Sequence, residues 1–482
     1  MKKNEERVGV VVGLGSNGEG ILKEDGMVVF VPFALVGEKI RYRVLKVTSK
    51  CAYGKVLEVL TPAEIRVRAN CPVFTKCGGC NLQHVKYFNQ LKIKEDIIAN
   101  CFKKIAGLSV DVKPAVKGDD EFRYRNKLQL PVQETSNGTV IGFYAENSHR
   151  VVQIDDCLIN APWTANVIKA FKTYFEEFNI KGYNELDKSG DVREITVKEV
   201  KGNLIVTAVV LNENIRGTDR LIYILKEQLK YTFSLYLNVN NTDTNVVYGE
   251  KFILLYGSPD YTGEMLGIKY KIGVRSFMQV NNSVCCKLYS AVRDAVDADD
   301  DTVVIDAYSG AGLMTALLAK NAKKAIGIEI IPEAVKCADD LALKNNLQNK
   351  ICNHLGKCED ILPNLVKEER EKNSKICVVL DPPRKGCAIS VIKALIDNDI
   401  DKIVYVSCLP STLARDVGLL VGSLDVIDGE IKKVADYKPR YEVSLVRPYD
   451  MFANTKHVET LVCLTKIKDI IGEDAGSALA DI

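Results

Sequence analysis

The chain has 482 residues, of which 47% are hydrophobic and 27% are charged. This length is enough for about three domains of about 150 residues each. No signal-peptide pattern is present, and no apolar run approaches the ~20 residues that a membrane helix needs. We therefore expect a cytoplasmic, globular protein that has no membrane association and is by default a monomer.

The net charge of +2 conceals an uneven distribution of charge along the chain. Residues 1–130 contain 23 Lys and Arg against 14 Asp and Glu, whereas the remainder contains 42 against 49. A basic first third joined to an acidic body is typical of a protein that grips a polyanion with one part and processes it with another. The alternative is an ordinary solvated basic surface.

Residues 1–65 predict a small antiparallel β-barrel of the oligonucleotide-binding type. Short β-rich runs alternate with Gly, Asn and Asp turns between residues 7 and 62. Lys39, Arg41 and Arg43 alternate along one run, which would place them on one strand face where they could bind RNA. The turn around Gly18 and the stretch 30–38 resemble a TRAM domain.

Residues 66–285 mix both kinds of element and predict a central α+β domain. A helix is expected at residues 87–106 and a strand at 204–211. Residues 122–127 interleave aromatic and cationic side chains, a pattern suited to unpaired bases and phosphates. Early in this segment, one glycine-containing loop carries Cys71, Cys77 and Cys80, which could wrap a metal centre if a fourth ligand is available.

Residues 286–482 alternate strand and helix, and this alternation predicts a doubly wound, Rossmann-like sheet. The first strand ends at Asp306 and leads into a Gly-rich loop that contains Tyr308 and Gly312. The second strand ends at Glu329, about 20 residues on, where an acid can accept hydrogen bonds from a ribose. The loop lacks the third glycine of a dinucleotide fingerprint and the Gly-Lys-Ser/Thr of a P-loop. The arrangement resembles a class I S-adenosylmethionine-dependent methyltransferase.

Two later strands end in residues that could perform chemistry at the same sheet edge. One is followed by Asp381-Pro382-Pro383-Arg384, and the next by Cys408. Carbon 5 of uracil is a poor nucleophile, but addition of a thiolate to carbon 6 makes an enolate that can accept a methyl group. The proton on carbon 5 must then leave to a general base, for which Glu459 is the best candidate.

Several motifs together resemble the RNA 5-methyluridine methyltransferases. They are Ser407-Cys408 with Pro410, the run 381–384, the run Phe-Met-Gln-Val-Asn at 277–281, and Asp450-Met-Phe leading to His457-Val-Glu459. The resemblance implies that Cys408 is the nucleophile and Glu459 the proton acceptor. It implies that S-adenosylmethionine is contacted by Gln279, Tyr308, Glu329 and Asp381. The chain departs from the family pattern at Leu409, at Ser309 and in an insertion around residues 432–446.

The resemblance also completes the cysteine cluster. Cys157 matches the distant fourth position of family members that hold a [4Fe-4S] cluster with Cys71, Cys77 and Cys80. Spacing alone does not separate iron–sulfur from zinc, which four thiolates also bind, but the resemblance favours the cluster.

The expected substrate is a uridine that is unpaired or flipped out of structured RNA. We favour 23S ribosomal RNA because the TRAM-like barrel and the cysteine cluster occur together, with the T-loop of transfer RNA as the alternative. Two other functions compete with this one. A methyltransferase acting on an exocyclic amine would have an aromatic residue in place of Arg384, and a non-catalytic RNA-binding scaffold would not need Cys408 and Glu459.

Overall fold

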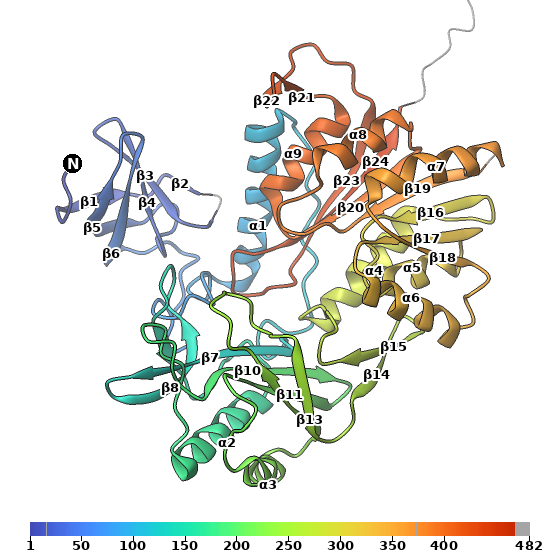
Figure 1. The fold of residues 1–482 in the computed structure, drawn as a ribbon. Helices are drawn as coiled ribbons and strands as arrows, with labels where there is room; N and C mark the ends of the chain where they lie inside the picture. The colour runs from blue at the N-terminus through green and yellow to red at the C-terminus, as the bar shows by residue number, and fades with distance from the viewer. Residues whose placement is uncertain (16, 373, 468–482) are drawn as a thin grey trace, which may run out of the picture.

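The computed structural model describes residues 1–15, 17–372 and 374–467, which fold into three bodies (Figure 1). The first body is a six-stranded sheet that lies to one side of the two larger ones. Its strands are β1 (Glu6–Val10), β2 (Gly13–Leu14), β3 (Gly20–Glu24), β4 (Met27–Val31), β5 (Lys39–Val47) and β6 (Cys51–Thr61), in the order β1-β5-β6-β4-β3-β2.

This sheet closes around its own core, but it is not wholly antiparallel as predicted, because β4 and β6 pair in parallel. Along β5, alternate residues such as Tyr42 are buried while Lys39, Arg41 and Arg43 are exposed, so the predicted basic face exists. Arg41 and Arg43 are nevertheless ion-paired, with Glu58 and Glu6 respectively, each at 2.7 Å. The basic face is thus partly neutralised.

The second body is a seven-stranded sheet in the order β13-β12-β11-β10-β7-β8-β9. Helices α2 (Trp163–Phe178) and α3 (Thr218–Gln228) pack against it around one apolar core. The strands are β7 (Lys127–Thr135), β8 (Gly138–Tyr144), β9 (Val151–Gln153), β10 (Val192–Val200), β11 (Asn203–Val210), β12 (Thr232–Val239) and β13 (Lys251–Tyr256). The strand predicted at 204–211 is β11, displaced by one residue.

The third body confirms the predicted doubly wound sheet. Its order is β18-β17-β16-β19-β20-β24-β23, with the first five strands parallel and the last two antiparallel. Its strands are β16 (Thr302–Asp306), β17 (Lys324–Glu329), β18 (Ile351–Leu355), β19 (Lys375–Leu380), β20 (Lys402–Ser407), β23 (Tyr441–Tyr449) and β24 (Glu459–Lys466). From β16 the strand order runs to β17 and β18 on one side and to β19 and β20 on the other. Ligands bind at the carboxyl ends of the two strands where the order changes direction, here β16 and β19.

Helices cover both faces of this sheet because its strands are apolar on both sides. Val303 and Ile305 of β16 belong to one core, whereas Val304 belongs to the other. The helices are α4 (Asn282–Val296), α5 (Leu313–Ala319), α6 (Pro332–Lys344), α7 (Cys358–Glu371), α8 (Ile389–Asp397) and α9 (Pro410–Val421). Two hairpins complete the fold: β14 (Asp260–Met265) with β15 (Ile268–Gly273), and β21 (Leu424–Ile427) with β22 (Glu430–Lys433).

The helix predicted at 87–106 is present as α1 (Tyr87–Cys101), which continues as one π-helical segment, Phe102–Ala106. Although it precedes the central sheet in the chain, it packs beside α9 and β23 (Figure 1). Ile97 and Phe102 lie in the core of the third body. Residues of the N-terminal third therefore complete the layer that covers one face of the C-terminal sheet, while the domain boundaries at 65 and 285 remain predictions.

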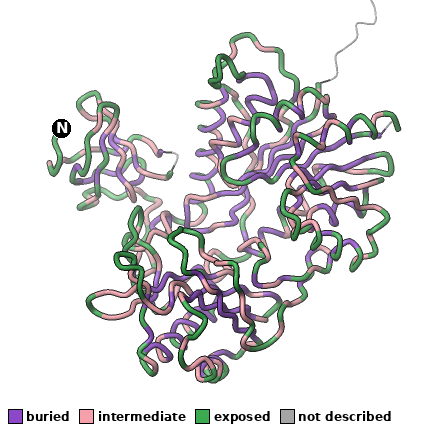
Figure 2. The backbone as a smooth tube through the Cα atoms, in the orientation of Figure 1, coloured by how far each residue is buried: buried purple, intermediate pink, exposed green. Residues whose placement is uncertain are grey.

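Figure 2 shows the buried backbone concentrated in the strands of the two larger sheets and in the helix segments facing them. Among the described residues, no helix is both long and apolar enough to cross a membrane.

Candidate active site

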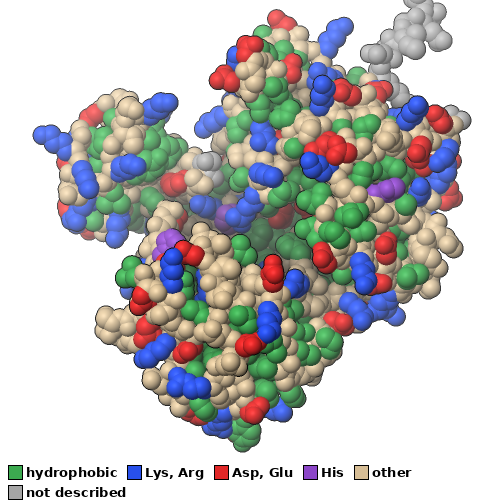
Figure 3. Space-filling model, in the orientation of Figure 1, with side chains coloured by type: hydrophobic (Ala, Val, Ile, Leu, Met, Phe, Trp, Pro, Cys, Tyr) green, Lys and Arg blue, Asp and Glu red, His purple; other side chains and the backbone are tan. Residues whose placement is uncertain are grey.

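A cavity of about 790 Å³ lies where the second and third bodies meet. The space-filling view shows the molecule hollowed between these bodies (Figure 3). Its floor is the carboxyl edge of the C-terminal sheet, and β7 and the β14–β15 hairpin contribute the opposite wall. Five of the six residues predicted to bind the cofactor or to catalyse the reaction line it: Gln279, Tyr308, Asp381, Cys408 and Glu459.

The strand register brings Cys408 and Glu459 together. Ser407, the last residue of β20, pairs with Thr460 of antiparallel β24. Cys408 is the next residue along one strand and Glu459 is the preceding residue of the other, so the two emerge side by side at the sheet edge. The carboxylate of Glu459 in turn raises the pKa of the Cys408 thiol, although burial contributes more to that rise.

Asp381 follows β19, the neighbour of β20, and faces the cavity. Its side chain is exposed to the cavity, and the surrounding protein atoms, followed by the charge of Asp306, raise its pKa. Glu459 is almost completely buried, and burial followed by the charge of Asp381 raises its pKa to about 8. The pKa values of both carboxyl groups are therefore raised above those of ordinary carboxyl groups, as is common for acid–base groups of an active site.

Arg384 also lines the cavity, and its guanidinium lowers the pKa of both Cys408 and Glu459 against the effect of burial. It stands where amine methyltransferases have an aromatic residue. His457 lies nearby, and burial followed by the charge of Arg384 lowers its pKa to about 4. The imidazole of His457 is thus neutral at physiological pH, and Arg384 carries the positive charge beside the thiol.

The Gly-rich loop after β16 is shaped by three contacts. Thr315 donates to the buried carboxylate of Asp306 at 2.7 Å. Gly312 has φ +80°, and a Cβ there would lie 2.7 Å from the Cβ of Ala338, so helices α5 and α6 approach closely at a residue that favours glycine. The predicted ribose acceptor Glu329 does not line the cavity. Its carboxylate accepts from the backbone of Gly310 at 3.1 Å and so braces the loop.

Of the run 122–127, only Arg125 and Lys127 line the cavity. The run is not a strand before Lys127, where β7 begins, and contact of its other residues with RNA stays a prediction. Arg123 pairs with Asp156 at 2.6 Å, and the hydroxyl of Tyr124 donates to the carbonyl of Ala453 at 3.0 Å.

The four predicted metal ligands come from two segments, the loop that carries Cys71, Cys77 and Cys80 and the turn that carries Cys157, and their role stays a prediction. Burial, and then the charges of Cys157, Cys77 and Cys71, raise the pKa of the Cys80 thiol to about 12. Gly79 donates to the sulfur of Cys77 at 3.3 Å, and Gly78 donates to the carbonyl of Tyr144 at 3.0 Å, which joins the loop to the end of β8. Within the ranges that the structure describes, no three His, Cys, Asp or Glu side chains stand close enough together to hold a metal ion.

Comparisons with known proteins agree with this geometry. The model of the tRNA (uracil-5-)-methyltransferase family matches residues 86–467. The chain is 37% identical to an uncharacterized RNA methyltransferase of Clostridium acetobutylicum over 475 residues, 97% of this chain and 98% of the relative. It is 34% identical to another from Halalkalibacterium halodurans over 468 residues, 96% of this chain and 98% of that one.

A solved structure is similar over almost the full length. It is the crystal structure of a Pyrococcus abyssi tRNA (uracil-54, C5)-methyltransferase in complex with S-adenosyl-L-homocysteine. The TM-score is 0.71 at 25% sequence identity, and the similarity covers 95% of this chain and all of the other.

Proposed function

This chain belongs to the tRNA (uracil-5-)-methyltransferase family, and from that premise we propose that it methylates carbon 5 of a uridine in structured RNA through a covalent bond to Cys408. The observation that carries the proposal is the pairing of β20 with β24, which sets a thiol and a carboxyl side by side in one cavity. An amine methyltransferase would need neither group in that place.

The chain's own residues perform three steps. The thiolate of Cys408 adds to carbon 6 of the uracil, and the electron pair of the 5,6 double bond moves to make an enolate. Carbon 5 takes the methyl group that S-adenosylmethionine supplies. Glu459 then removes the proton from carbon 5, the double bond re-forms, and the sulfur of Cys408 leaves as a thiolate.

S-adenosylmethionine fits the part of the cavity bounded by the Gly-rich loop. Gln279, Tyr308 and Asp381 face that space, and Glu329 braces the loop from behind. The segment that contains Gln279 is fixed from the central body, because the Asn126 side chain donates to the Gln279 carbonyl at 3.1 Å. Asp381 stands between the cofactor loop and Cys408, where it could also orient the uracil.

Cys71, Cys77, Cys80 and Cys157 would hold a [4Fe-4S] cluster. The two segments that carry these thiols are distant in sequence, yet the other three thiols raise the pKa of Cys80, so the segments lie near each other. Four thiolates are the ligand set of a [4Fe-4S] cluster. Zinc is the less favoured occupant. The cluster would stabilise the fold of this loop.

For the RNA we propose 23S ribosomal RNA, because the TRAM-like barrel and the cysteine loop occur in the same chain. Transfer RNA is the second candidate, favoured by the substrate named for the family and for the Pyrococcus abyssi enzyme. Radiolabelled S-adenosylmethionine supplied with transcribed 23S RNA or with transcribed transfer RNA decides between them. Mapping of 5-methyluridine in one RNA names the substrate, and labelling of neither, or methylation at an amine, would overturn the proposal.

A further inference from the structure

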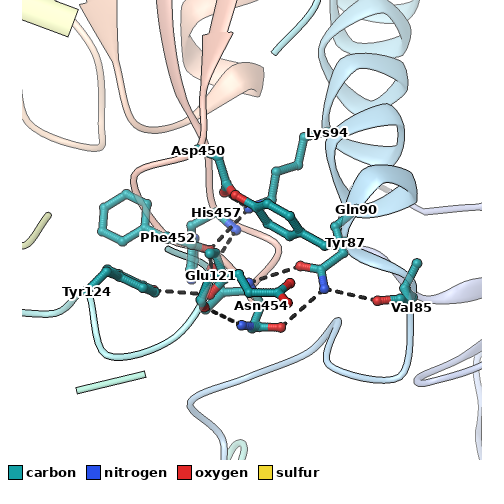
Figure 4. Close-up of polar contacts among 12 residues, drawn as sticks. Val85, Tyr87, Gln90, Lys94, Glu121, Tyr124, Asp450, Phe452, Asn454 and His457 are labelled. Carbon is teal, nitrogen blue, oxygen red and sulfur yellow. Dashed lines mark hydrogen bonds and ion pairs between the residues drawn. The ribbon is translucent and has the colours of Figure 1, made fainter. Parts of the chain in front are cut away.

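The loop that joins β23 to β24, residues 450–458, leads directly into Glu459 and contributes Phe452 to the cavity wall. Connecting loops are usually exposed and mobile. In this one, by contrast, Asp450, Asn454 and Thr455 are buried. Figure 4 shows that the polar groups around it come from α1 and from residues near 121–124, both remote in sequence.

Asn454 is the centre of these contacts. Its backbone nitrogen donates to Gln90 Oε1 at 3.0 Å, and Gln90 Nε2 donates back to Asn454 Oδ1 at 3.1 Å. Its side-chain amide donates to the carbonyl of Glu121 at 2.7 Å. Its own backbone has φ +67°, a left-handed conformation that Asn tolerates better than most residues.

The same residue receives the end of the cysteine loop. The backbone nitrogens of Asn81 and Leu82, which directly follow Cys80, donate to the carbonyl of Asn454 at 3.1 and 3.0 Å. All the hydrogen-bonding groups of Asn454 are therefore engaged, by α1, by the segment before β7 and by the cysteine loop. A shift in any of these elements would be transmitted to a residue five positions before Glu459.

A second anchor lies at the start of the loop. Asp450 forms a completely buried ion pair with Lys94 of α1 and accepts from the hydroxyl of Tyr87 at 2.8 Å. Lys94 also donates to the carbonyl of Phe452 at 3.1 Å. The loop is thus held to α1 at both Asp450 and Asn454, while its far end is fixed by the β20–β24 pairing.

We propose that Asn454 and Gln90 are positioning residues for Glu459, and that α1 and the cysteine loop hold the proton-accepting carboxyl in register with Cys408 through them. The inference rests on the proposed function. If Glu459 is no longer held in place beside Cys408, the thiolate can still add to carbon 6 and carbon 5 can still be methylated. The proton on carbon 5 is then removed slowly. The methylated RNA then stays bonded to the protein, because sulfur cannot depart before that proton is removed.

The test uses the full chain with transcribed 23S RNA, with transcribed transfer RNA in parallel, and with S-adenosylmethionine. Gln90→Met removes both hydrogen bonds between the two residues. Asn454→Gly removes the side-chain bonds of Asn454 to Gln90 and to the carbonyl of Glu121, and it keeps both the backbone donor and the left-handed backbone. Ile97→Val, in the apolar core on the same helix, is the control for general destabilisation. Glu459→Gln is the reference for a blocked proton transfer, and calorimetric binding of S-adenosylhomocysteine measures the folded fraction.

We expect both positioning variants to lower kcat by about 10- to 100-fold with an unchanged KM for RNA. We also expect them to accumulate a covalent protein–RNA band on denaturing gels, as Glu459→Gln does, while Ile97→Val forms none. Activity that falls only in proportion to the folded fraction, without that band, would overturn the inference and leave the proposed function standing. Absence of the band from Glu459→Gln as well would overturn the proposed covalent mechanism itself.

Discussion

Asp381 and Glu459, at the ends of two strands separated by β20, lie close enough that the charge of one raises the pKa of the other's carboxyl. Together with burial this places the pKa of Glu459 at about 8. Glu459 must be ionised to accept a proton, and Cys408 must be ionised to add to the uracil. Because both pKa values are raised, we expect kcat to increase with pH through about pH 8, where Glu459 ionises, and to keep increasing above it as the Cys408 thiol ionises.

Arg384 sets the pH range over which kcat increases. We expect Arg384→Gln to move the acidic limb of the kcat profile upward by about one pH unit, and so to lower kcat about tenfold near neutral pH, because the guanidinium no longer favours the two anions. Lys385→Gln, at the exposed neighbouring position, is the control and leaves the profile in place. Profiles that coincide for the wild type and Arg384→Gln would show that Arg384 does not tune the site.

Glu329 acts through the loop that it braces. Its carboxylate accepts from Gly310 and also from Ile330 and Ile331 at 2.8 and 2.9 Å. We expect Glu329→Gln to weaken binding of S-adenosylhomocysteine by about tenfold or more, since hydrogen bonds to a charged acceptor are lost. Isothermal titration calorimetry measures this, with exposed Glu333→Gln as the matched control. Equal affinities for the two variants would remove Glu329 from the cofactor site.

The Lys94–Asp450 pair allows a stability test. Both side chains are completely buried, so Lys94→Met would leave the charge of Asp450 without its partner. We expect the free energy of unfolding to fall by about 3–5 kcal/mol, measured by urea denaturation followed by circular dichroism. Lys375→Met, which breaks an exposed pair with Asp299, should change the unfolding midpoint little. Equal effects of the two substitutions would contradict the structural importance of the buried pair.

The proposed cysteine ligands predict the iron and sulfide content of the purified protein. Protein purified without oxygen should contain iron and acid-labile sulfide in a ratio close to one, and Cys157→Ser should lose most of both. Cys337→Ser, at an exposed position far along the chain, should lose neither. Stoichiometric zinc without sulfide would instead assign the four thiolates to a zinc site.

The sequence predicts the site best where the functional residues directly follow the strands of the C-terminal sheet. The alternation after residue 300 predicted the doubly wound sheet. In such a sheet the residues after parallel strands must meet at one edge, so Asp381 and Cys408 could be placed together before the fold was known. Glu459 was proposed from its motif and from the need for a base, and the antiparallel pairing of β24 places it beside Cys408.

Other features depend on contacts between distant segments. Nothing local in the sequence of α1 shows that it packs on the C-terminal body, or that Gln90 meets Asn454. The same holds for Tyr124, whose partner lies 329 positions further on. The insertion around residues 432–446 includes part of β23. Arg440 there donates to the carbonyl of Leu419 at 3.2 Å, near the end of α9.

The most direct test of the account is to incubate Glu459→Gln with S-adenosylmethionine and transcribed 23S or transfer RNA, digest the product, and locate the nucleotide-bearing peptide by mass spectrometry. We expect a methylated uridine bonded to Cys408, and no such product when Cys408 is also replaced by alanine. If the single variant Cys408→Ala forms 5-methyluridine as fast as the wild type, the covalent mechanism is wrong.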